Sequence, residues 1–308
     1  MNTMREEAAH YLMIRRALGF KLRGHDRLLE DFVVFLERTG APTITTEAAL
    51  AWATAPAEVS PIRWTQRLCA VRGFARHLGG IDPTVEVPPV DLLAYRRQRP
   101  TPYLYTERDI ARLVAAATGL RPTLRAATYQ TFFGLVASTG MRVGEAIHLD
   151  RTDVDLDAGV LDINDAKFRK HRRLPLHQST VVALSQYAEV RNELCVKPKA
   201  PSFFVSLAGT RLLDITVHQV FRQLLQPLCL AAQPGTGGPR IHALRHTFAV
   251  TTLREWYRSG ADMDGKLPVL SAYLGHADPA STYWYLQACP ELLALAAQRL
   301  ERQVGEPQ

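Results

Sequence analysis

The sequence lacks the features that mark several common classes of protein. It contains no run of about 18 uninterrupted apolar residues, so no membrane-spanning helix is expected. Its N-terminus, MNTMREEAAHYLMIRR, carries charges where a signal peptide needs an apolar stretch. The four cysteines are scattered without a C-x-x-C pair, which argues against a zinc cage or a disulfide framework. We therefore expect a cytoplasmic protein with no membrane partner.

Signatures of metal enzymes, hydrolases and nucleotide-binding proteins are also missing. The ten histidines form no H-E-x-x-H pattern, and the acidic residues form no EF-hand loop. No G-x-S-x-G turn is present, and the glycine-rich loop at 235–238 is not followed by the Gly-Lys-Ser/Thr of a P-loop. We therefore expect neither a metal ion nor a cofactor.

The length and the charge suit a folded protein with an anionic partner. A chain of 308 residues with 47% hydrophobic content is long enough for two domains with separate cores. The net charge of +7 and the pI near 9.4 favour a polyanion. Charge alone does not identify that partner.

The pattern along the chain predicts two domains joined by a basic linker. Residues 1–95 are expected to be helical, since apolar residues such as Leu29, Phe32 and Leu36 recur at helical spacing. Residues 96–102 are basic and contain two prolines, which is typical of an extended linker. This charge suits either a clamp around a duplex or a solvated hinge.

Residues 103–308 are expected to form a mixed α/β, mainly helical domain with a small antiparallel sheet. Short alternating runs at 154–156 and 160–163 flank a turn, and 173–176 is a further candidate strand. Helices are predicted over the following ranges: 107–117, 124–138, 179–194, 216–230, 242–257, 267–274 and 291–302.

Two segments place an arginine at or near the start of a predicted helix. Arg142 lies where an apolar helix stops at a glycine and a new helix begins, and a guanidinium there could grip two phosphate oxygens. The alternative is a pair with Glu145 along one helix turn. In the second segment, a spacing of three puts His242 and Arg245 on one helix face.

Two further segments carry a basic loop and a group of tyrosines. Residues 166–173 form a basic hairpin tip, which suits either a DNA groove or solvent. In the other segment a helix ends at Gly275-His276 and an aromatic-rich stretch follows. Tyr283 and Tyr285 project to different faces, so at most one of them points into a given site.

In chain order these four segments resemble the tyrosine recombinase family, which includes phage integrases, Xer resolvases and transposon-encoded recombinases. That family has an Arg in a T-G-x-R-x-x-E context, a Lys in a β-hairpin, H-x-x-R, L-G-H, and a Tyr nine residues beyond the last His. The resemblance covers residues 107–286. It implies the following catalytic residues, with Glu145 supporting them: Arg142, Lys167, His242, Arg245, His276 and Tyr285.

The resemblance also implies a fold for each domain. The N-terminal domain would be an all-α core-binding domain, a SAM-like helical bundle that binds DNA, and residues 103–308 the catalytic domain. Basic residues expected to contact DNA are Arg63, Arg67, Arg96, Arg97, Arg99, Arg169, Lys170, Arg172 and Arg173.

The implied reaction is cleavage and rejoining of DNA strands through a 3′-phosphotyrosine, without metal or ATP. The arginines would neutralise the phosphate and the histidines would hydrogen-bond to it. His242 would help take the proton from the Tyr285 phenol, and Lys167 would protonate the departing 5′ oxygen. The implied partners are double-stranded DNA at the nucleoid, three further copies of the chain in a tetramer, and accessory recombination proteins.

Some alternatives stay open. The family often has Gly-Lys-Gly at the hairpin, whereas Lys167 lies between Ala166 and Phe168, so Lys170 is a second candidate. A catalytically silent DNA-binding accessory protein and an enzyme that only relaxes supercoils remain competing functions. These residues do not choose among integration, excision, resolution and transposition of a mobile element. The helix at 291–302 suits docking onto a neighbouring copy or packing on its own domain.

Overall fold

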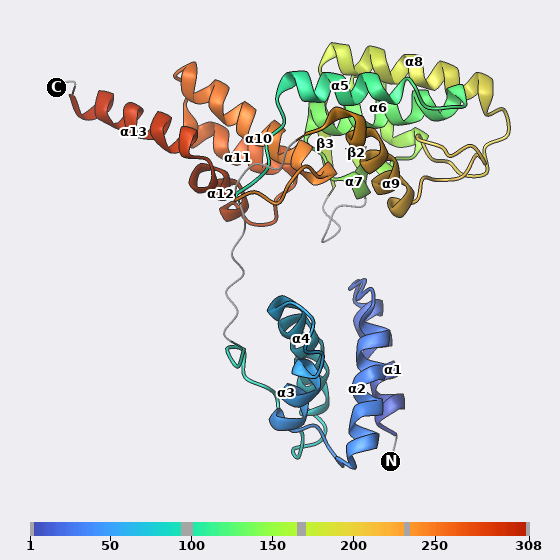
Figure 1. The fold of residues 1–308 in the computed structure, drawn as a ribbon, viewed down its shortest axis with the longest axis vertical. Coiled ribbons are helices and arrows are strands. Elements are labelled where there is room, and N and C mark those ends of the chain that lie inside the picture. The colour runs from blue at the N-terminus through green and yellow to red at the C-terminus, as the bar shows by residue number, and fades with distance from the viewer. Residues whose placement is uncertain (1–2, 94–100, 165–170, 231–234, 306–308) are drawn as a thin grey trace. The chain divides into compact units, whose positions relative to one another are not determined.

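The protein is described by a computed structural model that covers residues 3–93, 101–164, 171–230 and 235–305. The chain divides into two compact units, residues 1–99 and 100–308. This division falls within 96–102, the range predicted as a linker, most of which lies outside the described residues. Figure 1 shows helices in both units and a small sheet in the second.

The first unit is built from helices around one apolar core. Its helices are α1 (Met4–Ala17), α2 (His25–Thr39), α3 (Thr46–Thr54) and α4 (Pro61–Leu78). Thr45 caps α3 by accepting a hydrogen bond from the backbone N–H of Ala48. Phe32, Trp52 and Phe74 are buried in the core, as the helical spacing of apolar residues predicts.

The second unit places a three-stranded sheet among helices. The described elements are α5 (Glu107–Ala117), α6 (Thr123–Thr139), α7 (Val143–His148), η1 (Arg151–Asp153), β1 (Val154–Asp155), β2 (Val160–Ile163), β3 (Arg172–Pro175), α8 (Gln178–Leu194), α9 (Asp214–Leu225), η2 (Gln226–Leu228), α10 (Ile241–Arg258), α11 (Met263–Leu274), α12 (Ala280–Ala288) and α13 (Pro290–Gly305). The strands are antiparallel in the order β1-β2-β3, and Leu161 lies opposite both Val154 and Leu174. The expected fold class is confirmed: mainly helical, with a small antiparallel sheet.

Two apolar clusters support the second unit. The larger one contains Phe132 and Phe133 of α6 together with Phe221 of α9, and the buried face of the sheet belongs to it. The smaller one joins α10, α11, α12 and α13, and it includes Leu253 and Tyr285. The segments that carry the predicted site residues lie on both clusters.

Some element boundaries differ from the prediction for identifiable physical reasons. Strand β3 begins at Arg172 rather than residue 173. Helix α9 ends at Leu225, and the chain continues as a short 3-10 helix because Pro227 has no N–H to extend the α-helix. Helix α11 begins at Met263 rather than 267, since the Asp262 side chain caps it. Residues 280–288, predicted only as an aromatic-rich segment, form α12.

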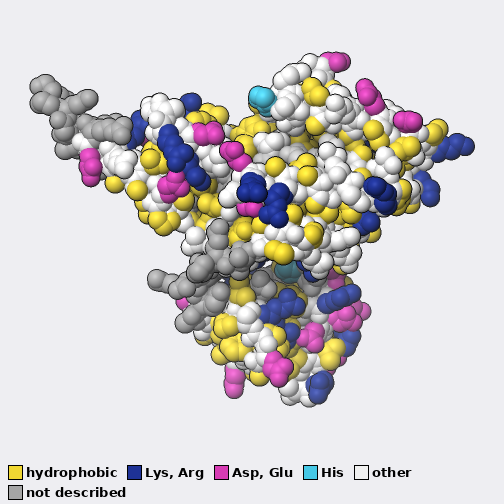
Figure 2. All heavy atoms as spheres, turned by 45° about the horizontal axis from the view of Figure 1, so that its top comes forward, with side chains coloured by type: hydrophobic (Ala, Val, Ile, Leu, Met, Phe, Trp, Pro, Cys, Tyr) yellow, Lys and Arg dark blue, Asp and Glu magenta, His cyan; other side chains and the backbone are white. Residues whose placement is uncertain are grey.

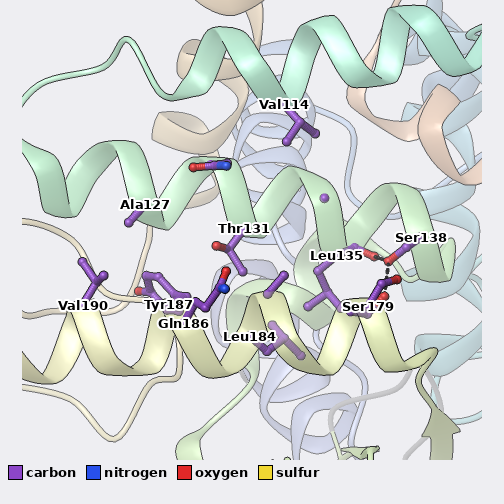
Figure 3. A pocket seen from close by; sticks show the side chains of 14 residues that line it. Val114, Ala127, Thr131, Leu135, Ser138, Ser179, Leu184, Gln186, Tyr187 and Val190 are labelled. Carbon is purple, nitrogen blue, oxygen red and sulfur yellow. Dashed lines mark hydrogen bonds between the residues drawn. The ribbon is translucent and has the colours of Figure 1, made fainter.

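An apolar cavity lies between α6 and α8, with one wall from α5. Its volume is about 370 Å³. Figure 3 shows Thr131 and Leu135 of α6 on one side and Leu184 of α8 on the other. None of the predicted site residues lines this cavity. Within the described residues, no helix is both long and apolar enough to cross a membrane.

On the face shown in Figure 2, basic side chains are scattered among acidic and apolar ones. That face therefore does not show one continuous basic surface. The net charge of the sequence is +7. The place where an anion would bind has to be found from the arrangement of particular residues.

Candidate active site

Arg142 lies at the junction of α6 and α7, where the chain changes direction. Helix α6 ends at Gly140, whose φ of 61° is in the left-handed region that favours glycine. A Cβ atom there would lie 2.5 Å from the ring of Phe248. Arg142 then caps α7, and its guanidinium donates to the Glu145 carboxylate and to the carbonyl of Gly275, each at 2.8 Å. The predicted pairing of Arg142 with Glu145 is therefore present.

Arg245 is held on α10 by two main-chain carbonyls. Its guanidinium donates to Gly140 at 2.8 Å and to Leu274 at 2.7 Å, and the residue is only 2% exposed. The carbonyl of Leu274 holds Arg245 and that of the next residue, Gly275, holds Arg142. The turn that ends α11 thus brings together two arginines that are far apart in the sequence.

The closeness of these two charges has an electrostatic cost. Burial, together with repulsion from Arg142, lowers the pKa of Arg245 to about 10. A buried guanidinium without a carboxylate partner is stabilised when an anion binds nearby. The hydrogen bonds of Arg245 to Gly140 and Leu274 go to neutral carbonyls, so the arrangement favours binding of an anion.

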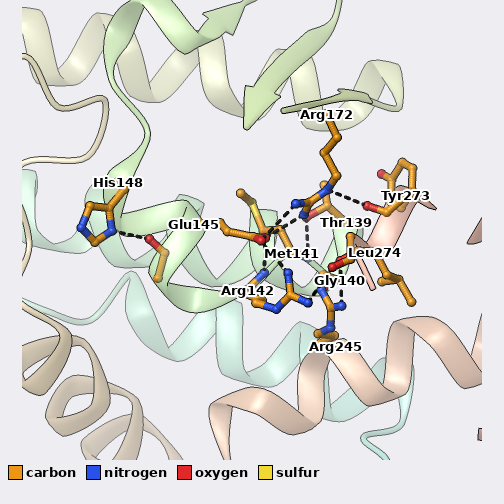
Figure 4. Close-up of polar contacts among 12 residues, drawn as sticks. Thr139, Gly140, Met141, Arg142, Glu145, His148, Arg172, Arg245, Tyr273 and Leu274 are labelled. Carbon is orange, nitrogen blue, oxygen red and sulfur yellow. Dashed lines mark hydrogen bonds and ion pairs between the residues drawn. The ribbon is translucent and has the colours of Figure 1, made fainter. Parts of the chain in front are cut away.

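Glu145 links Arg142 to a third arginine, Arg172 of β3. Figure 4 shows the side chains of Arg142 and Arg172 meeting at this carboxylate. Arg172 donates to both carboxylate oxygens, at 3.0 and 2.7 Å, and to the carbonyl of Tyr273. Burial favours the neutral form of Glu145, but the hydrogen bonds and charges of Arg172 and Arg142 outweigh it, and the pKa is lowered.

Arg172, one of the residues predicted to contact DNA, is bonded inside the protein. All three of its guanidinium nitrogens have partners inside the protein, and its side chain is 11% exposed. The shift of β3 by one residue makes Arg172 its first residue. It serves here as an internal support for Glu145 and, through it, for Arg142.

His242 lies at the start of α10, one turn before Arg245. Desolvation by the surrounding protein and repulsion from Arg245, Arg142 and Arg240 lower its pKa to about 4. His242 is exposed, so solvent reduces the effect of desolvation on its pKa. Repulsion by the arginines is then the more secure reason for the lowered pKa. The imidazole is therefore neutral at neutral pH and can donate or accept a hydrogen bond there.

The tyrosine segment forms α12, and its two tyrosines lie in different environments. Tyr285 is 2% exposed, whereas Tyr283 is 49% exposed, so the prediction that they project to different faces is confirmed. The phenolic oxygen of Tyr285 lies 3.1 Å from Nδ1 of His246. The ring of His276 stacks on Tyr285, with centroids 6.2 Å apart, and its Nδ1 lies 2.7 Å from the Thr282 hydroxyl.

The structure therefore brings five of the six predicted catalytic residues into one region. Arg142, Arg245 and the end of α11 share hydrogen bonds, and α10 contacts α12 through His246 and Tyr285. The sixth, Lys167, lies outside the described residues.

The other residues predicted to bind DNA are placed as follows. Arg63 is exposed on α4. Arg67 stacks on the ring of Trp52, with 3.7 Å to the ring centroid, and also contacts Asp31. Arg173 is exposed and pairs with Asp162 of β2. The remaining predicted contacts lie outside the described residues: Arg96, Arg97, Arg99, Arg169 and Lys170.

Two residues of this region, His246 and Thr282, were not among the predicted site residues. His246 directly follows Arg245 and comes one helical turn after His242, a spacing that could have indicated a common face. Thr282 offers no comparable signal, because its contact with His276 depends on how α12 packs. Among the described residues, no group of three or more His, Cys, Asp or Glu side chains could hold a metal ion.

Comparison with known proteins matches most of this chain. A family model described as the phage integrase family matches residues 104–291. A putative integrase/recombinase of Sinorhizobium fredii is 44% identical over 308 residues, which cover 98% of this chain and 98% of that protein. The tyrosine recombinase XerD of Caulobacter vibrioides is 30% identical, covering 91% of this chain and 90% of that protein.

The fold is also similar to that of solved structures. The structure of the Tn1549 transposon integrase in complex with transposon right end DNA aligns with a TM-score of 0.68. The alignment covers 97% of this chain and 99% of that one, with 16% identical residues. At this level of identity the likeness shows a shared fold.

Proposed function

Because the chain belongs to the phage integrase family of tyrosine recombinases, we propose that it cleaves and rejoins DNA at specific sites through Tyr285. The observation that carries this proposal is the pairing of Arg142 and Arg245 on the carbonyls of Leu274 and Gly275. Two guanidiniums held close together, with no carboxylate of the described residues bonded to Arg245, form a site suited to a phosphodiester.

The proposed reaction follows from the charge of its substrate. A DNA phosphodiester repels nucleophiles, and negative charge builds up on its non-bridging oxygens as attack proceeds. Arg142 and Arg245 stabilise that charge, and His242 and His276 hydrogen-bond to the same phosphate. The neutral state of His242 suits this role, since it adds no further charge to a cluster that already contains two arginines.

The products of the proposed step are a covalent intermediate and a free hydroxyl. Attack by Tyr285 gives a 3′-phosphotyrosine, and the 5′ oxygen leaves with a proton from Lys167. The intermediate conserves the energy of the phosphodiester bond, so a 5′ hydroxyl from another strand can reverse the step. We propose that neither metal nor ATP takes part.

The partners follow from the same proposal. Double-stranded DNA at the nucleoid is the substrate, and four copies of the chain assemble on two sites, with accessory proteins where the element requires them. The exposed side chain of Arg63 can reach a phosphate, and that of Arg173 can do so once its pair with Asp162 breaks. The role is integration, excision, resolution or transposition of a mobile element. The competing function is a DNA-binding accessory protein that does not cleave.

Trapping on a nicked suicide substrate tests this function. The substrate contains the recombination site from the ends of the surrounding element, and the reaction contains EDTA and no ATP. Wild type and Tyr283→Phe are expected to form a covalent protein–DNA adduct, and Tyr285→Phe is expected to form none. Binding without an adduct from wild type would favour the accessory protein, and loss of the adduct in Tyr283→Phe alone would assign the nucleophile to Tyr283.

A further inference from the structure

His246 is a titratable residue of the site to which the sequence analysis gave no role. It lies on α10, directly after Arg245 and one turn after His242. Its Nδ1 atom is 3.1 Å from the phenolic oxygen of Tyr285, which is hydrogen-bonding distance. The proposed nucleophile is therefore in contact with an imidazole other than the one predicted to take its proton.

Aromatic contacts fix the orientation of this imidazole. His242 meets the His246 ring edge to face, with centroids 4.7 Å apart, and Trp284 lies at 5.5 Å. The ring of Tyr285 is also 5.5 Å away, at an interplanar angle of 64°. His246 is half-buried, so its ring packs on three sides while Nδ1 points toward the phenol.

The burial of Tyr285 makes the contact relevant to its chemistry. Tyr285 is 2% exposed, so water has little access to the phenol in this structure, and a neighbouring side chain is placed to receive its proton. His276 stacks on the Tyr285 ring, and its Nδ1 faces the Thr282 hydroxyl. An imidazole can accept a proton and return it near neutral pH, which is the property that a reversible reaction requires.

We propose that His246 is the general base of the cleavage step and accepts the phenolic proton of Tyr285 as the phenol attacks phosphorus. This inference rests on the proposed function. The O–H bond of the phenol breaks, its proton passes to Nδ1 of His246, and the tyrosine oxygen forms a bond to phosphorus. The bond from phosphorus to the 5′ oxygen breaks, and that oxygen takes a proton from the general acid, to which we assign Lys167.

Rejoining runs the same transfers in reverse. A 5′ hydroxyl attacks the phosphotyrosine and gives its proton back to Lys167, which lost one during cleavage, and the tyrosine oxygen leaves phosphorus. His246 then returns its proton to that oxygen, which restores the starting pair. His242, with its ring against His246, remains available to hydrogen-bond to the phosphate.

Two substitutions separate a base from a residue that only positions the phenol. In His246→Asn the side-chain amide can reach the position of Nδ1 and hydrogen-bond to the phenol, but it cannot take the proton. In His246→Phe the ring contacts are kept and the hydrogen bond is lost. General base catalysis contributes about a hundred-fold or more, so both variants are expected to lose about that factor in the single-turnover rate of adduct formation.

A change to the acidity of the nucleophile gives a second test. It should alter the rate deficit of His246→Asn if His246 is a base, but not if His246 only positions the phenol. Difluorotyrosine at position 285 has a more acidic phenol and needs less help from a base. We expect it to shrink the deficit of His246→Asn relative to wild type. A deficit of the same size with both forms of the nucleophile would contradict the proposal.

The controls separate the possible failures. His218→Asn removes a partly exposed histidine of α9 that lies outside the site and is expected to cleave like wild type. DNA affinity and thermal melting show whether each variant is folded, and His246→Asn keeps the test valid if His246→Phe does not fold. Full activity of His246→Asn would overturn the inference alone. Absence of an adduct from wild type would overturn the proposed function and the inference with it.

Discussion

At the scale of single residues, Glu145 has the largest number of described charged contacts in the candidate site. Its carboxylate accepts hydrogen bonds from the backbone and the guanidinium of Arg142 and from two nitrogens of Arg172. A carboxylate that is almost completely buried is stable as an anion only while these donors remain. The position of Arg142 thus depends on a residue that itself touches no substrate in the proposed reaction.

We expect Glu145→Gln to destabilise the protein by about 3 kcal/mol at neutral pH, since it leaves Arg172 buried without its counter-charge. The pKa of Glu145 is lower in the folded protein than its ordinary value. The contribution of ionised Glu145 to the free energy of unfolding is therefore complete above its ordinary pKa of about 4.3. That contribution is lost as the pH falls through the pKa that Glu145 has in the folded protein. Urea unfolding of both proteins between neutral and acidic pH should show the difference in stability shrinking toward acid. A difference that does not change with pH would contradict this role.

Neighbouring arginines of β3 offer a matched comparison. Arg172→Gln is expected to cost about 3 kcal/mol, because it removes a buried partner of Glu145. Arg173→Gln removes an exposed pair with Asp162 and is expected to cost about 0.5 kcal/mol or less. Chemical unfolding of the two variants checks the contrast. An equal loss of unfolding free energy in both variants would show that the buried pair of Arg172 with Glu145 contributes no more to stability than the exposed pair of Arg173 with Asp162.

At the scale of elements, the junction between α6 and α7 depends on Gly140. We expect Gly140→Ala to destabilise the protein by about 3 kcal/mol, since the left-handed backbone disfavours a side chain and the new methyl group meets Phe248. The carbonyl of Gly140 also holds Arg245, so adduct formation should fall as well. Thermal melting and suicide-substrate trapping measure the two effects.

Gly134 of α6 provides the control for that prediction. It lies within the same helix, with nothing within 4 Å of an added Cβ. Alanine at position 134 is expected to stabilise the protein by about 0.5 to 1 kcal/mol, because it favours the helix more than glycine does. If both glycine variants behave alike, the effect at position 140 does not arise from its backbone conformation.

Much of the element order could be predicted from the sequence, because it follows from local patterns. The spacing of His242 and Arg245 fixes a common helix face, and the alternating residues at 154–156 and 160–163 predict the turn between β1 and β2. The contact of Glu145 with Arg172 could not be predicted, since the two are 27 residues apart and the strand was predicted to begin one residue later, at 173. The contact of His246 with Tyr285 likewise depends on the packing of α12 against α10.

At the scale of the whole molecule, the two units have separate apolar cores. Phe74 is fully buried in the first core and Phe133 in the larger core of the second unit. A chain with separate cores is not expected to unfold in one cooperative transition. The stability of each unit can then be changed without changing the other.

Calorimetry of two core variants tests this expectation. Phe74→Ala and Phe133→Ala each remove a buried ring, which costs about 3 to 5 kcal/mol in the core concerned. Phe74→Ala is expected to lower the transition of residues 1–99, and Phe133→Ala that of residues 100–308. A single transition that shifts equally in both variants would show that the units unfold together.

Arg142 and Arg245 are held by the main-chain carbonyls of Gly275 and Leu274, and this has a consequence for how the sequence of the site can change in evolution. A carboxylate partner is lost when one codon changes, but a main-chain carbonyl is supplied by whatever residue the codon specifies. Leu274 can therefore be exchanged for another apolar residue of similar volume without removing the acceptor of Arg245. Deleting or inserting one residue in the turn that follows α11 would misplace both acceptors at once. The site should thus tolerate amino-acid substitutions in this turn far better than insertions or deletions that change the length of the turn.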